Sequence, residues 1–182
     1  MQTYISILRG INVSGKRMIK MEDLRKMFET FNFKNTTTYI QSGNVVFQSV
    51  KKNNEDLENR ISRQILNQFG FEVPVIVKNK DEFVEVLNNN PFVKVRKEDT
   101  SKLHVTFLSK APETNLIDKI TTGNYGEDEF ILSGTTIYLF CPNGYGNTKL
   151  SNAFFESKLK VVATTRNWKT INELVRIAGS MP

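Results

Sequence analysis

The sequence of 182 residues has one cysteine, one histidine and no long run of apolar residues. A single cysteine, Cys141, excludes a disulfide within the chain, and this favours a reducing compartment such as the cytoplasm. The single histidine, His104, lies far from Cys141 in the sequence, so no spacing typical of a zinc or iron site is present. The longest apolar runs hold about four or five residues, far fewer than the roughly 20 needed to span a bilayer. We therefore expect a cytoplasmic protein with no metal, no cofactor and no membrane segment.

The positive charge of the chain is concentrated at its beginning. The net charge is +6 at pH 7, and residues 1–52 alone hold nine Lys and Arg against three acidic residues. A basic region of this kind attracts phosphate groups, although a solvated surface rich in lysine has the same composition. The hydrophobic content of 39% and charged content of 24% are ordinary for a soluble globular protein.

A nine-residue pattern occurs twice in the chain. Residues 39–47 read Tyr-Ile-Gln-Ser-Gly-Asn-Val-Val-Phe, and residues 130–138 read Phe-Ile-Leu-Ser-Gly-Thr-Thr-Ile-Tyr. Aromatic residues stand at both ends of each copy, and the Ser-Gly pair has the same position in both. The repeat predicts two copies of one small unit, and 182 residues are enough for two such units with adequate cores.

Hydrophobic periodicity predicts the same order of elements in each half: strand, helix, hairpin, helix, strand. In the first half we expect a strand ending near Arg9, a helix through 21–31, hairpin arms at 36–41 and 44–48, a helix through 57–69 and a strand at 73–77. In the second half we expect a strand at 103–107, a short helix from Pro112 to Ile120, the Ser133-Gly134 hairpin, a helix through Leu150 and Phe154, and a strand at 161–163. Pro74 indicates that the last strand of the first half lies at a sheet edge.

Two further helices are expected outside the repeated pattern, at residues 80–89 and 170–179. The second of these opens with Thr170-x-x-Glu173, the spacing of a capping box. The predicted fold class is α+β, with two tandem ferredoxin-like (βαββαβ) units and additional linking and C-terminal helices. The predicted domains are residues 1–79, the N-terminal unit, and residues 80–182, which hold the linking helix, the second unit and the C-terminal helix.

A long basic loop distinguishes the first unit from the second. Residues 9–20 separate its first strand and helix, whereas residues 109–111 suffice in the second unit. A loop with two glycines, four cations and no acid is costly to order, which indicates a purpose. The first two strands of a βαββαβ sheet run the same way, so the loop and the Ser42-Gly43 hairpin are expected at the same edge. The candidate ligand-binding residues there are Arg9, Gly10, Asn12, Lys16, Gln41, Ser42, Gly43 and Asn44.

The second unit has polar segments in other positions. Residues 142–149 lie between its third strand and second helix, and residues 164–168 are expected after its fourth strand. Since the third and fourth strands run oppositely to the first two, both segments are expected at the other edge of their sheet. The candidate ligand-binding residues there are Tyr145, Lys149, Arg166 and Asn167. The prediction is one polar cluster in each unit.

Four segments together resemble a widespread, mostly bacterial family catalogued as the domain of unknown function numbered 1697. They are residues 8–13 (Leu-Arg-Gly-Ile-Asn-Val), residues 38–47 (Thr-Tyr-Ile-Gln-Ser-Gly-Asn-Val-Val-Phe), residues 145–152 and residues 164–170. The resemblance spans nearly the whole chain in the right order. Two departures are Ser14, where glycine is commoner, and Asn147-Thr148, where Arg-Ser is commoner. The resemblance implies identity and fold, and it brings no activity, substrate or cofactor.

The four polar segments contain no Asp, Glu or His. They offer Arg, Lys, Asn, Gln, Ser, Thr and Tyr side chains, a set rich in donors that suits phosphate or carboxylate oxygens better than proton transfer. The first hypothesis is therefore a cytoplasmic module that binds a phosphorylated or other anionic small molecule. The oligomeric state is not indicated by the sequence.

Two other functions stay open at this point. RNA or single-stranded DNA could bind on an open sheet face through the strand aromatics Tyr39, Phe47, Phe130 and Tyr138. An enzyme could use Lys149 or Tyr145 without a metal, since both side chains act as bases once their pKa values fall, but no partner residue can be named. Whether the chain is an enzyme is therefore left open by the sequence.

Overall fold

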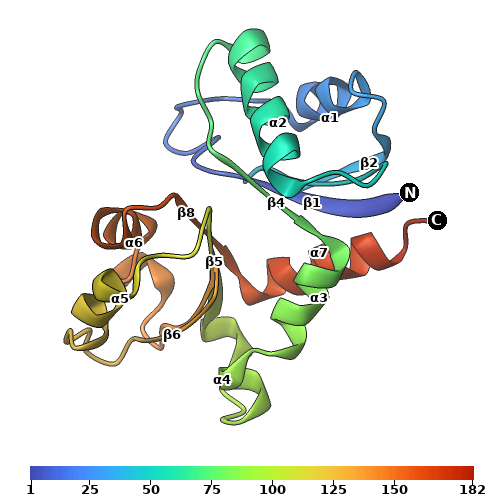
Figure 1. The fold of residues 1–182 in the computed structure, drawn as a ribbon. Helices are drawn as coiled ribbons and strands as arrows, with labels where there is room; N and C mark the ends of the chain where they lie inside the picture. The colour runs from blue at the N-terminus through green and yellow to red at the C-terminus, as the bar shows by residue number, and fades with distance from the viewer. The chain divides into compact units, whose positions relative to one another are not determined.

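The computed structural model describes residues 1–182, and the chain divides into two compact units. The first unit contains Met1–Val84 together with Glu173–Pro182, and the second contains Glu85–Asn172. Each unit has one four-stranded antiparallel sheet (Figure 1), so the fold is α+β. None of the helices combines the length and the apolar character needed to cross a membrane.

The first unit follows the predicted order of strand, helix, hairpin, helix and strand. Its elements are β1 (Gln2–Leu8), α1 (Met21–Glu29), β2 (Lys34–Tyr39), β3 (Asn44–Ser49), α2 (Asn54–Phe69) and β4 (Val75–Asn79), followed by α3 (Lys80–Asn88). The strand order is β2-β3-β1-β4, which puts β4 at an edge directly after Pro74. Proline is tolerated there because an edge strand does not need every backbone N–H for pairing.

The helix α2 shows why the sequence folds locally as predicted. Leu57, Ile61 and Ile65 recur every four residues and are fully buried. The side chain of Asn53 accepts a hydrogen bond from Glu55 N at 3.0 Å and caps the helix. Gly70 ends the helix at φ 79°, a left-handed conformation that glycine adopts without strain.

The second unit repeats this order. Its elements are α4 (Pro91–Lys94), the 3₁₀ helix η1 (Thr100–Lys102), β5 (Leu103–Leu108), α5 (Thr114–Thr121), β6 (Glu129–Ser133), β7 (Thr136–Phe140), the 3₁₀ helix η2 (Tyr145–Asn147), α6 (Asn152–Leu159) and β8 (Ala163–Asn167), and α7 (Trp168–Gly179) follows. The strand order β6-β7-β5-β8 matches that of the first unit. A cluster of buried side chains, among them Ile120, Leu139 and Phe155, forms the core.

The nine-residue repeat does not superpose in the two sheets, contrary to the sequence alignment. Leu8 N donates to Gly43 O, whereas Leu108 N donates to Thr135 O, so Gly43 corresponds to Thr135 and not to Gly134. The reason is loop length: the first hairpin connects its strands with residues 40–43 and the second with residues 134–135. Since side chains alternate between faces, a shift of one residue exchanges the two faces of the strand.

The last strand of the second unit is longer than predicted. The sequence predicts an end at residue 163, with residues 164–168 following as a polar segment, but β8 continues to Asn167. The side chain of Asn167 accepts a hydrogen bond from Thr170 N at 2.8 Å, so α7 begins at Trp168 and the expected start at Thr170 is wrong. A strand made of polar residues has the same composition as a polar loop, so composition alone does not distinguish the two.

The compact units differ from the predicted division into residues 1–79 and 80–182. The boundaries fall inside α3 and inside α7, and the last ten residues group with the first unit. A contact in that unit fixes the end of the chain, since Gln48 Nε2 donates to the carbonyl of Pro182 at 2.7 Å. Helices that continue directly from an edge strand, as α3 and α7 do, give no turn signal at which a sequence can be cut.

Candidate functional site

The long basic loop of the first unit is a small hairpin held by its own backbone. Asn12 N donates to Arg17 O at 3.2 Å, and Lys16 N donates to Val13 O at 3.0 Å. Ser14 and Gly15 form the turn at φ 50° and 73°, the left-handed pair that a two-residue hairpin turn requires. The loop is therefore held by backbone hydrogen bonds of its own, and it presents Lys16 and Arg17 to solvent.

Asn12 joins this loop to the turn of the first hairpin. Its Nδ2 donates to Ile19 O at 2.9 Å and to Gln41 O at 2.9 Å, and its Oδ1 accepts from Ile19 N at 2.8 Å. The predicted meeting of residues 9–20 with the Ser42-Gly43 hairpin thus occurs between Asn12 and Gln41. All of these bonds are internal, so Asn12 shapes the loop.

The other candidates in the hairpin also hold the backbone. Asn44 is buried, and its Nδ2 donates to Tyr39 O at 3.1 Å and to Ser42 Oγ at 3.0 Å. Gly43 lies so close to β1 that an added Cβ would stand 2.7 Å from Leu8 Cβ. These residues fix the turn against the end of β1, and they determine where the basic loop begins.

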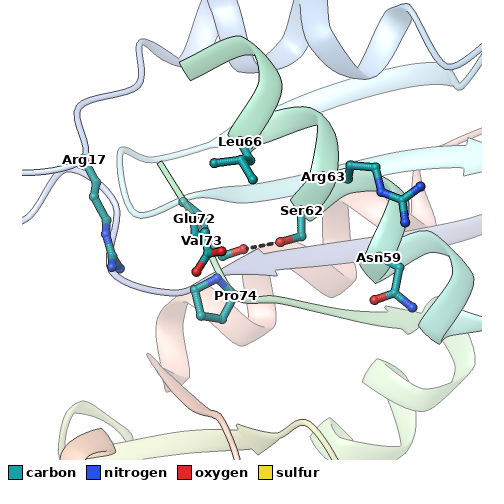
Figure 2. Close-up of a pocket in the computed structure, with 8 residues that line it drawn as sticks. All are labelled: Arg17, Asn59, Ser62, Arg63, Leu66, Glu72, Val73 and Pro74. Atoms are coloured by element: carbon teal, nitrogen blue, oxygen red, sulfur yellow. Dashed lines mark hydrogen bonds between the residues drawn. The ribbon is translucent and has the colours of Figure 1, made fainter. Parts of the chain in front are cut away.

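A pocket of about 440 Å³ opens beside the loop, between the loop, α2 and the chain that leads into β4 (Figure 2). The end of β1 lies next to its floor, because Arg9 N donates to Pro74 O at 2.9 Å. The lining residues are Arg17 from the loop, Asn59, Ser62, Arg63 and Leu66 from α2, and Glu72, Val73 and Pro74.

Two arginines stand on opposite sides of this pocket, with Glu72 between them (Figure 2). The guanidinium of Arg17 lies over Gly10, where an added Cβ would be 3.6 Å from its Nη1. Neither Arg17 nor Arg63 forms an ion pair or a side-chain hydrogen bond, and both are exposed. Ser62 Oγ donates a hydrogen bond to Val73 O at 2.8 Å. The free donors that line the pocket are therefore the two guanidinium groups and the Asn59 amide.

The candidate residues of the second unit are held by their own sheet and helix. The Tyr145 hydroxyl donates to Thr165 Oγ1 at 3.1 Å, and Thr165 Oγ1 donates to Asn152 Oδ1 at 2.7 Å. Arg166 is only 9% exposed, and its Nη1 donates to Thr164 Oγ1 at 3.1 Å and to Thr165 O at 2.8 Å. Asn167 caps α7, and Lys149 is exposed.

His104 belongs to the same polar network, which is not predicted by the sequence. Its ring stacks on Tyr145 with centroids 4.8 Å apart, and burial lowers its pKa, so the neutral imidazole is favoured. The buried Nδ1 has no hydrogen-bond partner. Thr106, two residues along β5 on the same face, has its Oγ1 2.6 Å from Thr165 Oγ1. The alternation of His104 and Thr106 in one strand was the sequence feature that could have indicated a polar face on β5.

The aromatic platform considered for RNA is not an open surface. Phe47 is fully buried in the core of the first unit and stacks on Tyr4. Phe130 packs edge-on against Phe155 in the core of the second unit, and Tyr138 is 4% exposed with its hydroxyl bonded to Val86 O. Phe47 and Phe130 face the cores of their units, and Tyr138 is buried on the other face of β7 beside Val86 of α3, so these three do not form an open aromatic surface.

Cys141 is fully buried, and burial raises the pKa of its thiol to about 11. A thiol with this pKa is almost wholly protonated at neutral pH and is a poor nucleophile. No group of three or more His, Cys, Asp and Glu side chains is arranged to hold a metal ion.

The family model described as protein of unknown function (DUF1697) matches residues 1–138. The chain belongs to this family. DUF1697 membership agrees with the resemblance drawn from the sequence motifs, two of which lie beyond the matched residues. Among solved structures, the conserved bacterial protein SP0830 from Streptococcus pneumoniae has the same fold, with a TM-score of 0.73 and 21% identity over 97% of this chain and 98% of that chain. No curated protein matches the sequence.

The pocket residues of this DUF1697 protein were mostly missed from sequence. Arg17 lies in the loop that length and charge singled out, but Asn59 and Arg63 lie on the solvent face of α2. Polar and basic side chains on an exposed helix face are ordinary, so nothing in their spacing set these two apart. Their proximity to Arg17 is a consequence of the βαββαβ chain path.

Proposed function

We propose that the first unit binds a phosphorylated or other anionic small molecule in the pocket between the basic loop and α2. The observation that carries the proposal is that two unpaired guanidinium groups, those of Arg17 and Arg63, line one pocket of about 440 Å³. Pockets for small molecules commonly have volumes of about 300–1,000 Å³.

The chemistry of the lining favours an oxyanion. A guanidinium donates two parallel hydrogen bonds to a phosphate or carboxylate, and such charge-assisted bonds are about twice as strong as neutral ones. Neither guanidinium forms an ion pair, so an anion bound in the pocket gains electrostatic attraction from both. The Asn59 amide can donate a further hydrogen bond from the same side as Arg63.

Glu72 gives the pocket a second kind of group. Its carboxylate lies between the two arginines and accepts hydrogen bonds only, so it opposes a simple dianion at the centre of the pocket (Figure 2). It suits a ligand that carries hydroxyl or amino groups beside its anionic group. The proposed ligand is therefore a small phosphorylated or carboxylated metabolite with donors of its own.

Most of the residues predicted for ligand binding support the site indirectly in this proposal. Asn12, Gly43 and Asn44 hold the loop and the hairpin in place, and such restraint lowers the cost of ordering the loop when a ligand binds. Lys16 at the tip of the loop adds positive potential. Lys149 and Arg166 of the second unit are not needed.

We also propose that the two units are ferredoxin-like and that the protein is cytoplasmic. The strand orders β2-β3-β1-β4 and β6-β7-β5-β8, each with two crossing helices, support two ferredoxin-like units. A single buried cysteine, which leaves no internal disulfide, is consistent with the cytoplasm. We assign no catalytic activity.

A thermal-melt screen against phosphorylated metabolites, carboxylates and nucleotides tests the proposal. A ligand at about 100 times its dissociation constant stabilises the fold by about 2.7 kcal/mol, a shift of several degrees for a chain of this length. We expect the shift to shrink strongly in Arg17→Ala and in Arg63→Ala. Arg25→Ala is the matched control, because the Arg25 side chain is 43% exposed on α1 and is paired with Glu29 at 2.9 Å. A ligand that stabilises all variants equally would show that the pocket is not its site.

A further inference from the structure

Three of the four sheet edges in the protein are blunted, and two of them are capped by acidic side chains. At β4, the Glu58 carboxylate of α2 accepts a hydrogen bond from Val77 N at 2.8 Å. At β8, the Glu156 carboxylate of α6 accepts one from Ala163 N at 3.1 Å. In each unit the helix that precedes the edge strand thus occupies an outward N–H group, and a further strand cannot pair there.

The third edge, β2, is interrupted. Its pairing with β3 shifts between Lys34 and Thr37, and Asn35 has φ 51°. A bulge and polar residues such as lysine are devices by which natural sheets prevent edge-to-edge pairing.

The fourth edge, β6, has neither device. Its five residues pair with β7 without a shift. The strands are joined by Gly134 and Thr135, with Gly134 at φ 58°, so Ser133 and Thr136 form the hydrogen-bonded pair that closes the hairpin. Pairs alternate along an antiparallel ladder, so Phe130 and Leu132 direct their N–H and C=O groups outward. No hydrogen bond reaches the backbone of either residue from another part of the chain.

Apolar side chains beside this edge are partly exposed to solvent. An apolar pocket of about 560 Å³ lies between the edge and α5, lined by Pro112, Ile117, Phe130 and Leu132 among others. On the opposite face of the strand, Ile131 is 41% exposed. Unpaired backbone groups and apolar side chains are thus combined at one edge, which is the arrangement that accepts an added strand.

We propose that β6 pairs with β6 of a second copy of this chain, antiparallel and centred on Ile131. In that register Phe130 stands opposite Leu132 of the second copy, and each outward N–H and C=O group of one finds its partner in the other. Ile131 faces Ile131 of the second copy at a close non-hydrogen-bonded position, where Cα atoms are about 4.5 Å apart. The two sheets become one, and both exposed isoleucines are covered.

Charge at the two ends of β6 selects this direction and this partner. Glu127 and Asp128 precede the strand, and Glu129, which begins it, is already paired with Arg96 at 2.6 Å. Lys110 precedes Ala111, which lines the same pocket as Gly134 at the other end of the strand. Antiparallel pairing of two copies brings the acidic end of each strand to the lysine end of the other, whereas parallel pairing would place acid beside acid.

The mass of the protein in solution as a function of concentration tests the proposal. Sedimentation velocity is expected to show a dimer at high concentration that dissociates on dilution. Ile131→Lys should leave a monomer with an unchanged circular dichroism spectrum, while Val95→Lys, at a residue 76% exposed, should still dimerise. A wild-type monomer at every concentration, or a dimer that survives Ile131→Lys, would overturn the proposal.

A cross-link tests the register. In Ile131→Cys, mild oxidation should join two copies, because close non-hydrogen-bonded pairs meet the distance limits of a disulfide. Ser133→Cys is the control, since Ser133 would face Glu129 of the second copy and lie far from its own counterpart. The native Cys141 is fully buried and does not compete. Cross-linking of the Ser133→Cys variant in place of the Ile131→Cys variant would contradict the register.

Discussion

Substitution of Gly43 by alanine tests how the first hairpin is locked to β1. Gly43 has φ 77°, and an added Cβ would stand 2.7 Å from Leu8 Cβ and 2.8 Å from Ile11 Cδ1. Both neighbours are buried, Leu8 at 0% and Ile11 at 2% exposure, so neither can move aside freely. Gly134 in the second hairpin has φ 58° but no atom within 4 Å of its added Cβ, and it is the matched control.

The two costs can be separated by this pair of variants. A left-handed backbone costs a residue with a Cβ about 1–2 kcal/mol, and this applies to both glycines. Overpacking a well-filled site costs about 1–3 kcal/mol more, and this applies to Gly43 alone. We therefore expect a loss of about 1–2 kcal/mol for Gly134→Ala and about 2–5 kcal/mol for Gly43→Ala.

Amide hydrogen exchange followed by mass spectrometry is the suitable assay, because it reports the stability of β3 and of β7 separately. Protection of β3 should fall more in Gly43→Ala than protection of β7 falls in Gly134→Ala. Equal losses would refute the steric argument and show that Leu8 and Ile11 relax around the new methyl group.

Two further predictions concern titratable groups. Burial lowers the pKa of His104 from its ordinary 6.5, so on acidification the unfolded chain binds the proton before the folded chain does. The free energy of unfolding should therefore fall as the pH drops below 6.5. His104→Gln should remove that dependence in a pH series of urea denaturations. Burial raises the pKa of Glu58, which nevertheless accepts a hydrogen bond from Val77 N. Glu58→Gln keeps an acceptor and should be tolerated at pH 7, whereas Glu58→Ala should cost about 1–3 kcal/mol because the N–H loses its partner. Equal stability of these two variants would show that the N–H is satisfied otherwise.

The order of the main elements was predictable because most of the longer helices and strands carry a clear period, which the polar strand β8 and the short helix α4 do not. The spacing of Leu57, Ile61 and Ile65 predicts α2, and the alternation of Leu103, Val105 and Phe107 predicts β5. Register was not predictable in the same way. The identical Ser-Gly pairs suggested equivalent turns, but turn length decides which face each side chain takes, and the two turns differ in length.

The candidate site was only partly accessible from sequence. Loop length and charge indicated residues 9–20, and the contact of Asn12 with Gln41 bears out that the loop meets the hairpin. Arg166 was predicted to bind a ligand because it is a cation in a polar segment. It is buried because β8 extends through it. Arg63 carried no signal, since its role depends on a neighbour that is distant in sequence.

An NMR titration with inorganic phosphate and pyrophosphate determines whether an anion binds between Arg17 and Arg63 of the first unit. We expect the side-chain Nε–H signals of these two arginines and the amides of residues 10–18 and 59–66 to shift together with one dissociation constant. The same shifts should be lost in the Arg17→Ala/Arg63→Ala double variant. Shifts confined to Arg166 and its surroundings in the second unit, or equal shifts in the double variant, would show that the anion binds elsewhere and that the proposed pocket is wrong.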